Sequence, residues 1–126
     1  MKSGWLILIT ISFLNISCSH KMQRVNTCFQ GKLVKRGICG QRVIQVLDQQ
    51  VSGLELARNW TDSLAHRQYE NVFTVANPCN FPADIKEGDT FSFTVVTAED
   101  SPCVQCYAFT PVPAQQHRIS TGCNRN

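Results

Sequence analysis

Seven cysteines in a chain of 126 residues constrain the fold more than any other feature of this sequence. A single domain of this size has a small apolar core, and disulfides stabilise such domains in oxidising compartments outside the cytoplasm. Six of the seven lie from residue 28 onward: Cys28, Cys39, Cys79, Cys103, Cys106 and Cys123. Because six is an even number, all of them can pair, and the pattern predicts an exported domain with three disulfides.

The seventh cysteine, Cys18, follows a segment typical of a secretory signal. Lys2 gives a positive start, and residues 5–16 form a mostly apolar run that is shorter than the about 20 residues of a membrane-spanning helix. Ser17, directly before Cys18, is typical of bacterial lipoprotein cleavage sites, in which the cysteine thiol is alkylated with diacylglycerol. Cleavage after Ser19 is the alternative, because small residues stand at the positions that an ordinary signal requires. We therefore expect a signal peptide at 1–17, a lipidated tether at 18–27 and one domain at 28–126.

Alternation of apolar and polar residues, interrupted by turn residues, predicts a mainly β domain. Residues 32–36 and 42–48 flank a loop that contains Gly37, as in a β-hairpin. Residues 90–97 alternate most clearly, with three apolar side chains on one face and Ser and Thr on the other. We expect further short strands at 54–57, 71–76, 107–110 and 116–121.

The stretch 58–69 is mostly polar, and we expect a long loop with at most one helical turn, which Asp62 would cap. Five or six short strands around one longer insertion favour a small five- to six-stranded OB-like barrel, closed or partly open, cross-linked by disulfides. An immunoglobulin-like β-sandwich is the alternative, although it usually has about seven strands.

Three interpretations of the six cysteines compete. Structural disulfides are favoured, because each would stabilise a small domain by about 2–4 kcal/mol. Cys103 and Cys106 also have the Cys-x-x-Cys spacing of a thiol–disulfide redox pair or of half a zinc site, but no thioredoxin-like strand–helix pattern and no second such motif accompany them. Cys28 and Cys39 would lie at opposite ends of a strand and are not expected to pair, whereas Cys28 and Cys123 bracket the domain and are expected to join its termini.

The formal net charge of +3, from 12 Lys and Arg against 9 Asp and Glu, comes without a basic run, so nucleic acid is not expected as a partner. No catalytic, phosphate-binding, dinucleotide or metal motif is present, and we expect no enzyme, no cofactor and no metal site. Binding is favoured, because OB-like barrels offer a concave face and loops to ligands. The candidate binding residues are two aromatic residues on the long loop and four cations around the first hairpin: Trp60, Tyr69, Lys32, Lys35, Arg36 and Arg42. The alternative for each is structural, with Trp60 covering the core and the cations facing water.

Several segments resemble a group of small, cysteine-rich lipoproteins of Bacteroidetes. The matching segments are 37–39, 46–47, 71–73, 77–82, 85–89 with Phe91 and Phe93, and the Cys103-x-x-Cys106 motif. Signals of this group often end in Ser-Cys-Ser, as residues 17–19 do. The resemblance implies an envelope location and a β-rich fold, and it implies no activity. In this context Asp62-Ser63-Leu64 is similar to the tripeptide at which Bacteroidetes O-glycosylate exported proteins, so Ser63 is a candidate glycosylation site; a turn cap is the alternative.

The sequence therefore predicts an exported lipoprotein, anchored in the membrane through Cys18, whose β domain binds an envelope protein or glycan or serves as an accessory subunit. The expected location is the bacterial cell envelope, at the outer membrane; a secreted or periplasmic protein is the alternative. A thiol–disulfide oxidoreductase that uses Cys103 and Cys106, and a purely structural envelope component, are the competing functions.

Overall fold

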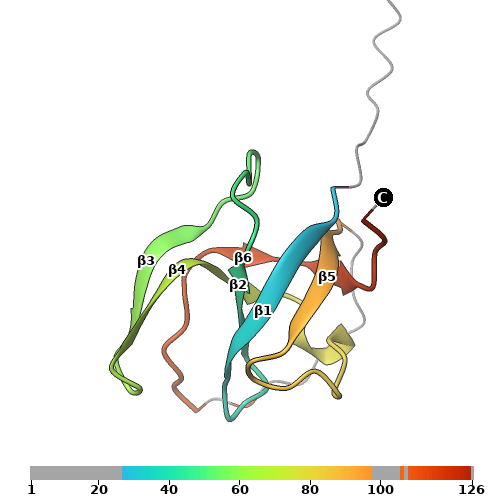
Figure 1. Ribbon diagram of the computed structural model, residues 1–126. Coiled ribbons are helices and arrows are strands. Elements are labelled where there is room, and N and C mark those ends of the chain that lie inside the picture. The colour runs from blue at the N-terminus through green and yellow to red at the C-terminus, as the bar shows by residue number, and fades with distance from the viewer. Residues whose placement is uncertain (1–26, 98–105, 107, 126) are drawn as a thin grey trace, which may run out of the picture.

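The computed structural model describes residues 27–97, 106 and 108–125. These residues form one sheet of seven strands with a single 3-10 turn (Figure 1). The elements are β1 (Phe29–Arg36), β2 (Arg42–Val46), β3 (Ala57–Asp62), β4 (Arg67–Val75), η1 (Pro78–Asn80), β5 (Thr90–Val95), β6 (Gln116–His117) and β7 (Ile119–Thr121). The prediction of a mainly β domain with disulfides is thereby confirmed.

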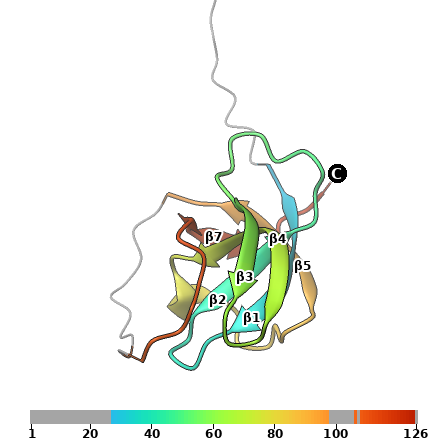
Figure 2. The same cartoon turned by 90° about the vertical axis from the view of Figure 1, so that its left-hand side faces the viewer.

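The strands follow the order β3-β4-β2-β1-β5-β7, and β6 pairs with β4 outside this path. All neighbours are antiparallel except β4 and β6, which are parallel. Among the described residues, β3 and β7 lie at the two ends of the path and do not pair, so the sheet is open. A closed barrel, one form that the sequence suggested, is therefore wrong. The two views show that the sheet is strongly twisted and curled (Figures 1 and 2).

The predicted β1–β2 hairpin is present, and it carries a β-bulge. The pairing of β1 with β2 shifts between Leu33 and Lys35, so that Val34 is one extra residue on β1. Successive side chains of a regular strand alternate between faces, and an extra residue changes which side chains share a face. Leu33 is fully buried and the Lys35 side chain is only 13% exposed, so both lie toward the interior.

The β3–β4 hairpin replaces the loop that the sequence predicted over 58–69. β3 begins at Ala57, so the strand expected at 54–57 is displaced toward the C-terminus. Trp60 on β3 lies directly opposite Tyr69 on β4. The Asp62 carboxylate does cap the following turn, because Oδ1 accepts hydrogen bonds from the backbone N–H groups of Leu64 (3.0 Å) and Ala65 (3.3 Å). This turn is not helical; it joins two strands.

The remaining strand predictions hold in part. β4 covers all but the last residue of the segment expected at 71–76, and β5 covers the segment expected at 90–97 only as far as Val95. The segment expected at 116–121 is divided into β6 and β7 by Arg118. No strand covers 108–110, and residue 107 lies outside the described part of the chain. Pro111 and Pro113, which have no N–H to donate, follow this stretch directly.

The core lies on the concave side of the sheet, where aromatic and aliphatic side chains from five strands meet. Its buried members are Phe29, Leu33, Ile44, Val46, Phe73, Val75, Phe81, Phe93 and Ile119. Gly31 on β1 allows β2 and β5 to approach closely, because a Cβ atom there would lie 2.9 Å from Cγ2 of Ile44 and 3.0 Å from the Phe93 ring.

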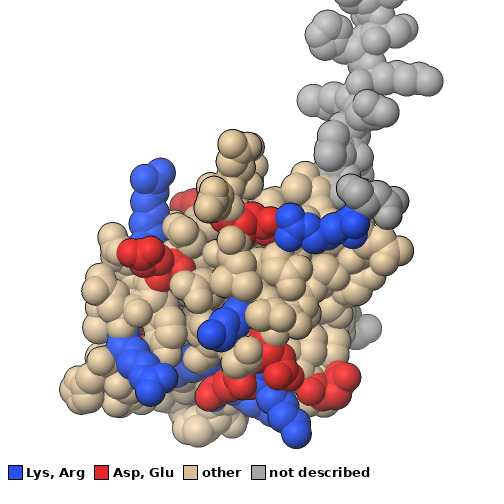
Figure 3. All heavy atoms as spheres, in the orientation of Figure 1, with Lys and Arg blue, Asp and Glu red and all other residues tan. Residues whose placement is uncertain are grey.

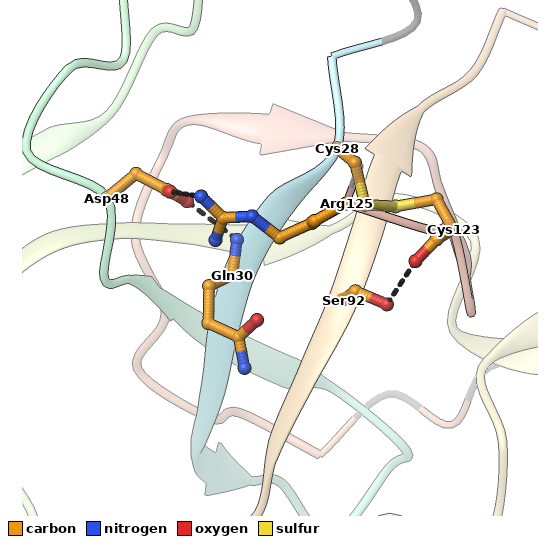
Figure 4. Close-up of a disulfide and its surroundings, with 6 residues drawn as sticks. All are labelled: Cys28, Gln30, Asp48, Ser92, Cys123 and Arg125. Atoms are coloured by element: carbon orange, nitrogen blue, oxygen red, sulfur yellow. Dashed lines mark hydrogen bonds and ion pairs between the residues drawn. A yellow bond between two sulfur atoms is a disulfide. The ribbon is translucent and has the colours of Figure 1, made fainter.

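The two chain termini of the domain meet at one end of the sheet, which we call the terminal end: Cys28, Asp48, Cys123 and Arg125 (Figure 4). Cys28 and Cys123 form a disulfide with a Cα–Cα distance of 5.8 Å, as predicted. Beside it, the Asp48 carboxylate accepts a hydrogen bond from the backbone N–H of Gln30 (2.6 Å) and forms an ion pair with Arg125 (2.7 Å). The first described residues of the domain therefore lie at the terminal end.

Candidate functional site

Three connections lie at the opposite end of the sheet, which we call the loop end: residues 37–41, residues 63–66, and residues 106 and 108–111. A disulfide between Cys39 and Cys106, with a Cα–Cα distance of 5.2 Å, joins the first connection to the third. The Cys39 Sγ atom also lies 3.8 Å from the carbonyl oxygen of Ala108. Figures 1 and 2 show the β1–β2 loop and the β3–β4 turn at this same end of the molecule.

An ion pair between Lys35 and Asp62 joins the second connection to the rest of the loop end. The Lys35 Nζ atom lies 2.8 Å from Asp62 Oδ2, and the two side chains are only 13% and 4% exposed. The same ammonium group donates a hydrogen bond to the carbonyl oxygen of Pro111 at 3.0 Å. Lys35 reaches Asp62 although β1 lies three strands away from β3 in the sheet order, because Lys35 shares the interior face of β1 with Leu33 and the sheet curls (Figure 2).

Burial raises the pKa of the Asp62 carboxyl, but the hydrogen bond from Lys35 and those from the backbone N–H groups of Leu64 and Ala65 outweigh burial and lower the pKa below its usual value. The carboxylate is therefore ionised at neutral pH and neutralises the Lys35 charge. A buried pair satisfied on both sides holds elements together and does not present a free charge to a ligand.

An aromatic pair stands beside this ion pair. The Trp60 and Tyr69 rings stack at a centroid distance of 6.0 Å and an interplanar angle of 21°. The Lys35 Nζ atom lies 5.6 Å from the centre of the Trp60 ring, within the range of a cation–π contact. Two of the predicted binding residues thus lie on neighbouring strands, and they face the ion pair.

A pocket of about 450 Å³ opens next to these residues. Its polar lining includes two cations from the ends of β1 and β4, Arg36 and Arg67, and its wall includes Tyr69. Neither guanidinium forms an ion pair with another described residue. Two acidic residues also line the pocket: Asp62, which pairs with Lys35, and Glu87, whose Oε1 accepts a hydrogen bond from the backbone N–H of Arg36 at 2.7 Å. The pocket therefore combines two guanidinium groups that have no ion pair to a described residue with one aromatic ring and the Glu87 carboxylate.

Three large apolar side chains are exposed at the loop end, one on each of its connections, and one of them, Leu64, lines the pocket. Phe109 is 84% exposed, Ile38 is 81% exposed and Leu64 is 68% exposed. Of the large apolar side chains that the structure describes, the next most exposed are Leu47 (43%) and Val95 (38%), which follow β2 and end β5 at the other end of the sheet. Figure 3 shows uncharged residues at the lower tip of the molecule and charged residues of both signs above them.

The structure brings four of the six predicted binding residues together and leaves two apart. Trp60, Tyr69 and Lys35 contact one another or share the pocket with Arg36. Lys32 stands on β1 between the buried Gly31 and Leu33, and therefore on the opposite face. Arg42 is 6% exposed and does not face water, which corrects the expectation of a solvated cation.

Burial, and then the neighbouring Arg36, lower the pKa of the Arg42 guanidinium. Its Nη1 donates a hydrogen bond to the carbonyl oxygen of Gly40 at 2.6 Å, and its Cζ lies 5.8 Å from the centre of the Phe81 ring. Arg42 therefore stabilises the β1–β2 loop through its hydrogen bond to the Gly40 carbonyl oxygen. Ser63, the candidate glycosylation site, is exposed in the β3–β4 turn.

The structure describes five of the seven cysteines. Cys106 is bonded to Cys39 and not to Cys103, its partner in the Cys-x-x-Cys motif. Cys79 is also disulfide-bonded. Cys103 and Cys18 lie outside the described residues. Within the described part of the chain, no three His, Cys, Asp or Glu side chains are grouped so as to hold a metal ion.

Sequence reasoning missed four contributors to the loop end: Ile38, Leu64, Arg67 and Phe109. It treated Asp62 as a turn cap and as part of a glycosylation tripeptide, and not as the partner of Lys35. Ile38 stands beside Cys39 and Phe109 two residues before Pro111, which marks the loops but does not reveal that the side chains are exposed. Arg67 and Leu64 lay in the stretch that was predicted to be a loop.

No family model, curated protein or solved structure matches this chain. The resemblance to Bacteroidetes lipoproteins therefore rests on the sequence segments alone. Among the described residues there is no helix with the length and apolarity needed to cross a bilayer.

The loop end offers charge, an aromatic face and apolar contact. Lys35 and Asp62 neutralise each other, and the described thiols Cys39 and Cys106 are oxidised. The groups left available for intermolecular contact are the guanidinium groups of Arg36 and Arg67 and the three exposed apolar side chains. This combination is suited to binding an amphiphilic or mixed apolar and anionic surface.

Proposed function

We propose that the chain is an exported lipoprotein, anchored through a lipid on Cys18, whose β domain binds a partner at the cell envelope and catalyses no reaction. One observation carries the proposal: the Cys39–Cys106 disulfide joins two loops that present exposed apolar side chains. Loops that are cross-linked lose little conformational entropy when they bind, so the disulfide favours a role in recognition. An envelope protein or glycan is the expected partner.

Export is supported by the disulfide-bonded cysteines, because such bonds persist mainly in oxidising compartments. An anchor at the N-terminus is compatible with binding at the loop end, because Cys28, at the start of the described chain, lies at the terminal end (Figure 4). We place the protein at the outer membrane, with a secreted or periplasmic protein as the alternative.

For the fold itself we propose a partly open barrel of the OB type. Two pairings support this assignment: β6 lies parallel to β4, and β7, after the single residue Arg118, lies antiparallel to β5. A hydrogen bond from the backbone N–H of Val96 to the carbonyl oxygen of Arg118 (2.9 Å) bridges the interruption. If β6 and β7 act as one strand, the order around the curved sheet is that of an OB fold, whose loops border a ligand site. The β-sandwich alternative has no such support, because the described strands form a single sheet.

The anchor is tested by intact mass and fractionation of the protein from its native membranes. We expect an N-terminal Cys18 that carries diacylglycerol and an acyl chain, and a protein that fractionates with the outer membrane. A Cys18→Ser variant should lose the lipid mass and leave the membrane fraction. A Ser17→Ala variant is the matched control and should behave as the wild type, because alanine is also small. A wild-type chain cut after Ser19 without lipid would contradict the proposal.

The same material tests the competing function. A thiol–disulfide oxidoreductase requires a reactive thiolate, so native protein should be alkylated at Cys103 or Cys106 under mild conditions. We expect no alkylation before reduction, and Cys39 bonded to Cys106 in the peptide map. Rapid alkylation at either cysteine would favour the oxidoreductase. Ser63 is tested by comparing the mass of the wild type with that of Ser63→Ala, where loss of a glycan mass would identify the modification.

A further inference from the structure

We propose that the loop end is a second membrane contact, which binds an anionic lipid surface. The apolar side chains of Ile38, Leu64 and Phe109 insert among the lipids, and Arg36 and Arg67 bind lipid phosphates. This inference rests on the proposed function insofar as that function places the protein at a membrane. It adds a contact site, the residues that make it and the class of lipid that it selects.

The distribution of exposed apolar side chains is the first observation. The three most exposed large apolar side chains of the described residues, Phe109, Ile38 and Leu64, occupy the three connections at one end of the molecule. Transfer of these side chains from water into the apolar part of a bilayer would be favourable. They stand on separate loops at the same end of the molecule, and of the three only Leu64 lines the pocket. A fluid bilayer surface accommodates separate projecting side chains without needing a complementary shape.

The charge at the same place is the second observation. Arg36 and Arg67 line the pocket together with Leu64, and no described acidic residue pairs with either guanidinium. Three cations and two carboxylates, those of Asp62 and Glu87, line this pocket, so its net charge is +1; Glu87 stays charged while it accepts a hydrogen bond from a backbone N–H group. The charge of Lys35 is neutralised by Asp62. A guanidinium fits a phosphate group through two parallel hydrogen bonds, so the pocket is suited to the headgroup phosphates of anionic lipids.

The rigidity of the loop end is the third observation. The Cys39–Cys106 disulfide and the hydrogen bond from Lys35 to Pro111 hold the loops that carry Ile38 and Phe109, and the Lys35–Asp62 pair holds the turn that carries Leu64. The side chains are therefore presented in a fixed arrangement before they meet a surface. A fixed arrangement reduces the entropic cost of binding.

The length of the N-terminal segment permits this contact on the membrane that holds the anchor. Residues 18–27 can span at most about 35 Å when extended. The eight residues of β1, which run from the terminal end to the loop end, span about 26 Å. The domain can therefore lie along the membrane with both ends at its surface. Because the anchor keeps the domain close to the bilayer, the effective lipid concentration is high and even a weak second contact forms.

The experiment places a fluorescent reporter at the loop end of the full-length chain. Phe109→Trp is introduced in a Trp5→Phe/Trp60→Phe background, so that the reporter is the only tryptophan. The protein is reconstituted with vesicles of phosphatidylcholine, or of phosphatidylcholine with phosphatidylglycerol, whose acyl chains are brominated. We expect the emission of the Phe109→Trp reporter to shift to the blue and to be quenched by the brominated lipids in the vesicles that contain phosphatidylglycerol. Leu47→Trp in the same background is the control at the other end, and its emission should stay that of an aqueous tryptophan.

Variants then separate the two parts of the surface. Ile38→Ser and Leu64→Ser should each lower the equilibrium constant for insertion about tenfold, because each removes the burial of one large apolar side chain. Arg36→Gln/Arg67→Gln should abolish the difference between the two kinds of vesicle. Arg58→Gln, an exposed arginine of β3 outside the pocket, should change neither readout.

Three results would overturn the inference. Equal quenching of the Phe109→Trp and Leu47→Trp reporters would show that the loop end does not insert. Equal quenching of the Phe109→Trp reporter in both kinds of vesicle would show that the loop end does not select anionic lipid. A blue shift caused by a soluble envelope protein fraction, and not by vesicles, would assign the surface to a protein.

The N-terminal mass, measured on the same sample, separates this inference from the proposed function. A lipid-free Cys18 together with a reporter at position 109 that responds to vesicles contradicts only the proposed function. A lipidated Cys18 together with a silent reporter at that position contradicts only this inference.

Discussion

The terminal end and the loop end are built from the same two parts, a disulfide and an ion pair, yet these parts sit in different surroundings. At the terminal end the Asp48–Arg125 pair is open to water, with the arginine side chain 49% exposed. At the loop end the Lys35–Asp62 pair is almost fully buried. For the large apolar side chains the difference is opposite: those of the loop end are more exposed to water than those of the terminal end. The loop end is therefore the part in which polar groups are used for internal support and apolar groups are left for contact.

The largest expected effect concerns the two disulfides. The double variants Cys28→Ser/Cys123→Ser and Cys39→Ser/Cys106→Ser open loops of 95 and 67 residues, and each should lower the free energy of unfolding by about 4–5 kcal/mol, measured in urea. The two losses should be nearly equal, because loop entropy varies only with the logarithm of length.

Local hydrogen exchange then separates the two ends. Only the loop-end variant should show faster amide exchange at residues 37–41, since of these two disulfides only Cys39–Cys106 is attached to that loop. Faster exchange there in the terminal-end variant as well would mean that the two ends are not independent, and the comparison would fail.

The next largest effect concerns the buried ion pair of the loop end. Lys35→Met leaves the Asp62 carboxylate buried without its cation, and we expect the free energy of unfolding to fall by about 3 kcal/mol. Lys32→Met, on the same strand but the opposite face, is the matched control and should change stability by less than about 0.5 kcal/mol. Thermal and urea unfolding measure both. Equal effects of the two variants would contradict the buried pair.

Lowering the pH is a second test of the buried ion pair. Because the pKa of Asp62 is lower in the folded chain than in the unfolded chain, its ionisation stabilises the fold above the unfolded pKa of about 3.9, and this stabilisation is lost as pH falls through the lowered folded value. Unfolding followed from pH 6 down to about pH 2 should therefore show a smaller loss of stability in Asp62→Asn than in the wild type. Parallel curves for the two proteins would show that Asp62 does not carry this dependence.

The smallest effect is expected at the terminal end. Arg125→Gln removes an exposed ion pair, and the free energy of unfolding should fall by no more than about 1 kcal/mol. The effect should disappear at high salt, because mobile ions screen exposed charges. A loss as large as that of Lys35→Met would mean that the two ends support the fold equally.

Sequence reasoning succeeded where alternation and turn residues coincide. The β1–β2 hairpin and β5 were predicted because their apolar residues face one core and their connections contain glycine. It failed for β3, an edge strand that is mostly exposed and therefore mostly polar, so alternation could not distinguish it from a loop. Trp60 and Tyr69 were the one useful signal there. They indicate a hairpin only once they are known to lie opposite each other on β3 and β4.

The candidate site was predicted only in part, because residue type was the only guide to it. Trp60, Tyr69, Lys35 and Arg36 were singled out by residue type, and they do meet. Arg42 was singled out on the same ground and is buried. Residue type shows that a side chain carries charge or an aromatic ring, but neighbours in space decide whether that group faces water or the core.

The amino-acid sequence alone determined that this chain is a small β domain with paired cysteines, because strand periodicity and cysteine number are local properties that can be counted along a chain. Tertiary structure decided that Cys39 pairs with Cys106, which lysine is neutralised and where apolar side chains project. These features depend on contacts between segments 27 to 67 residues apart in the chain. Because such contacts are formed only when the sheet curls, no window of sequence contains them.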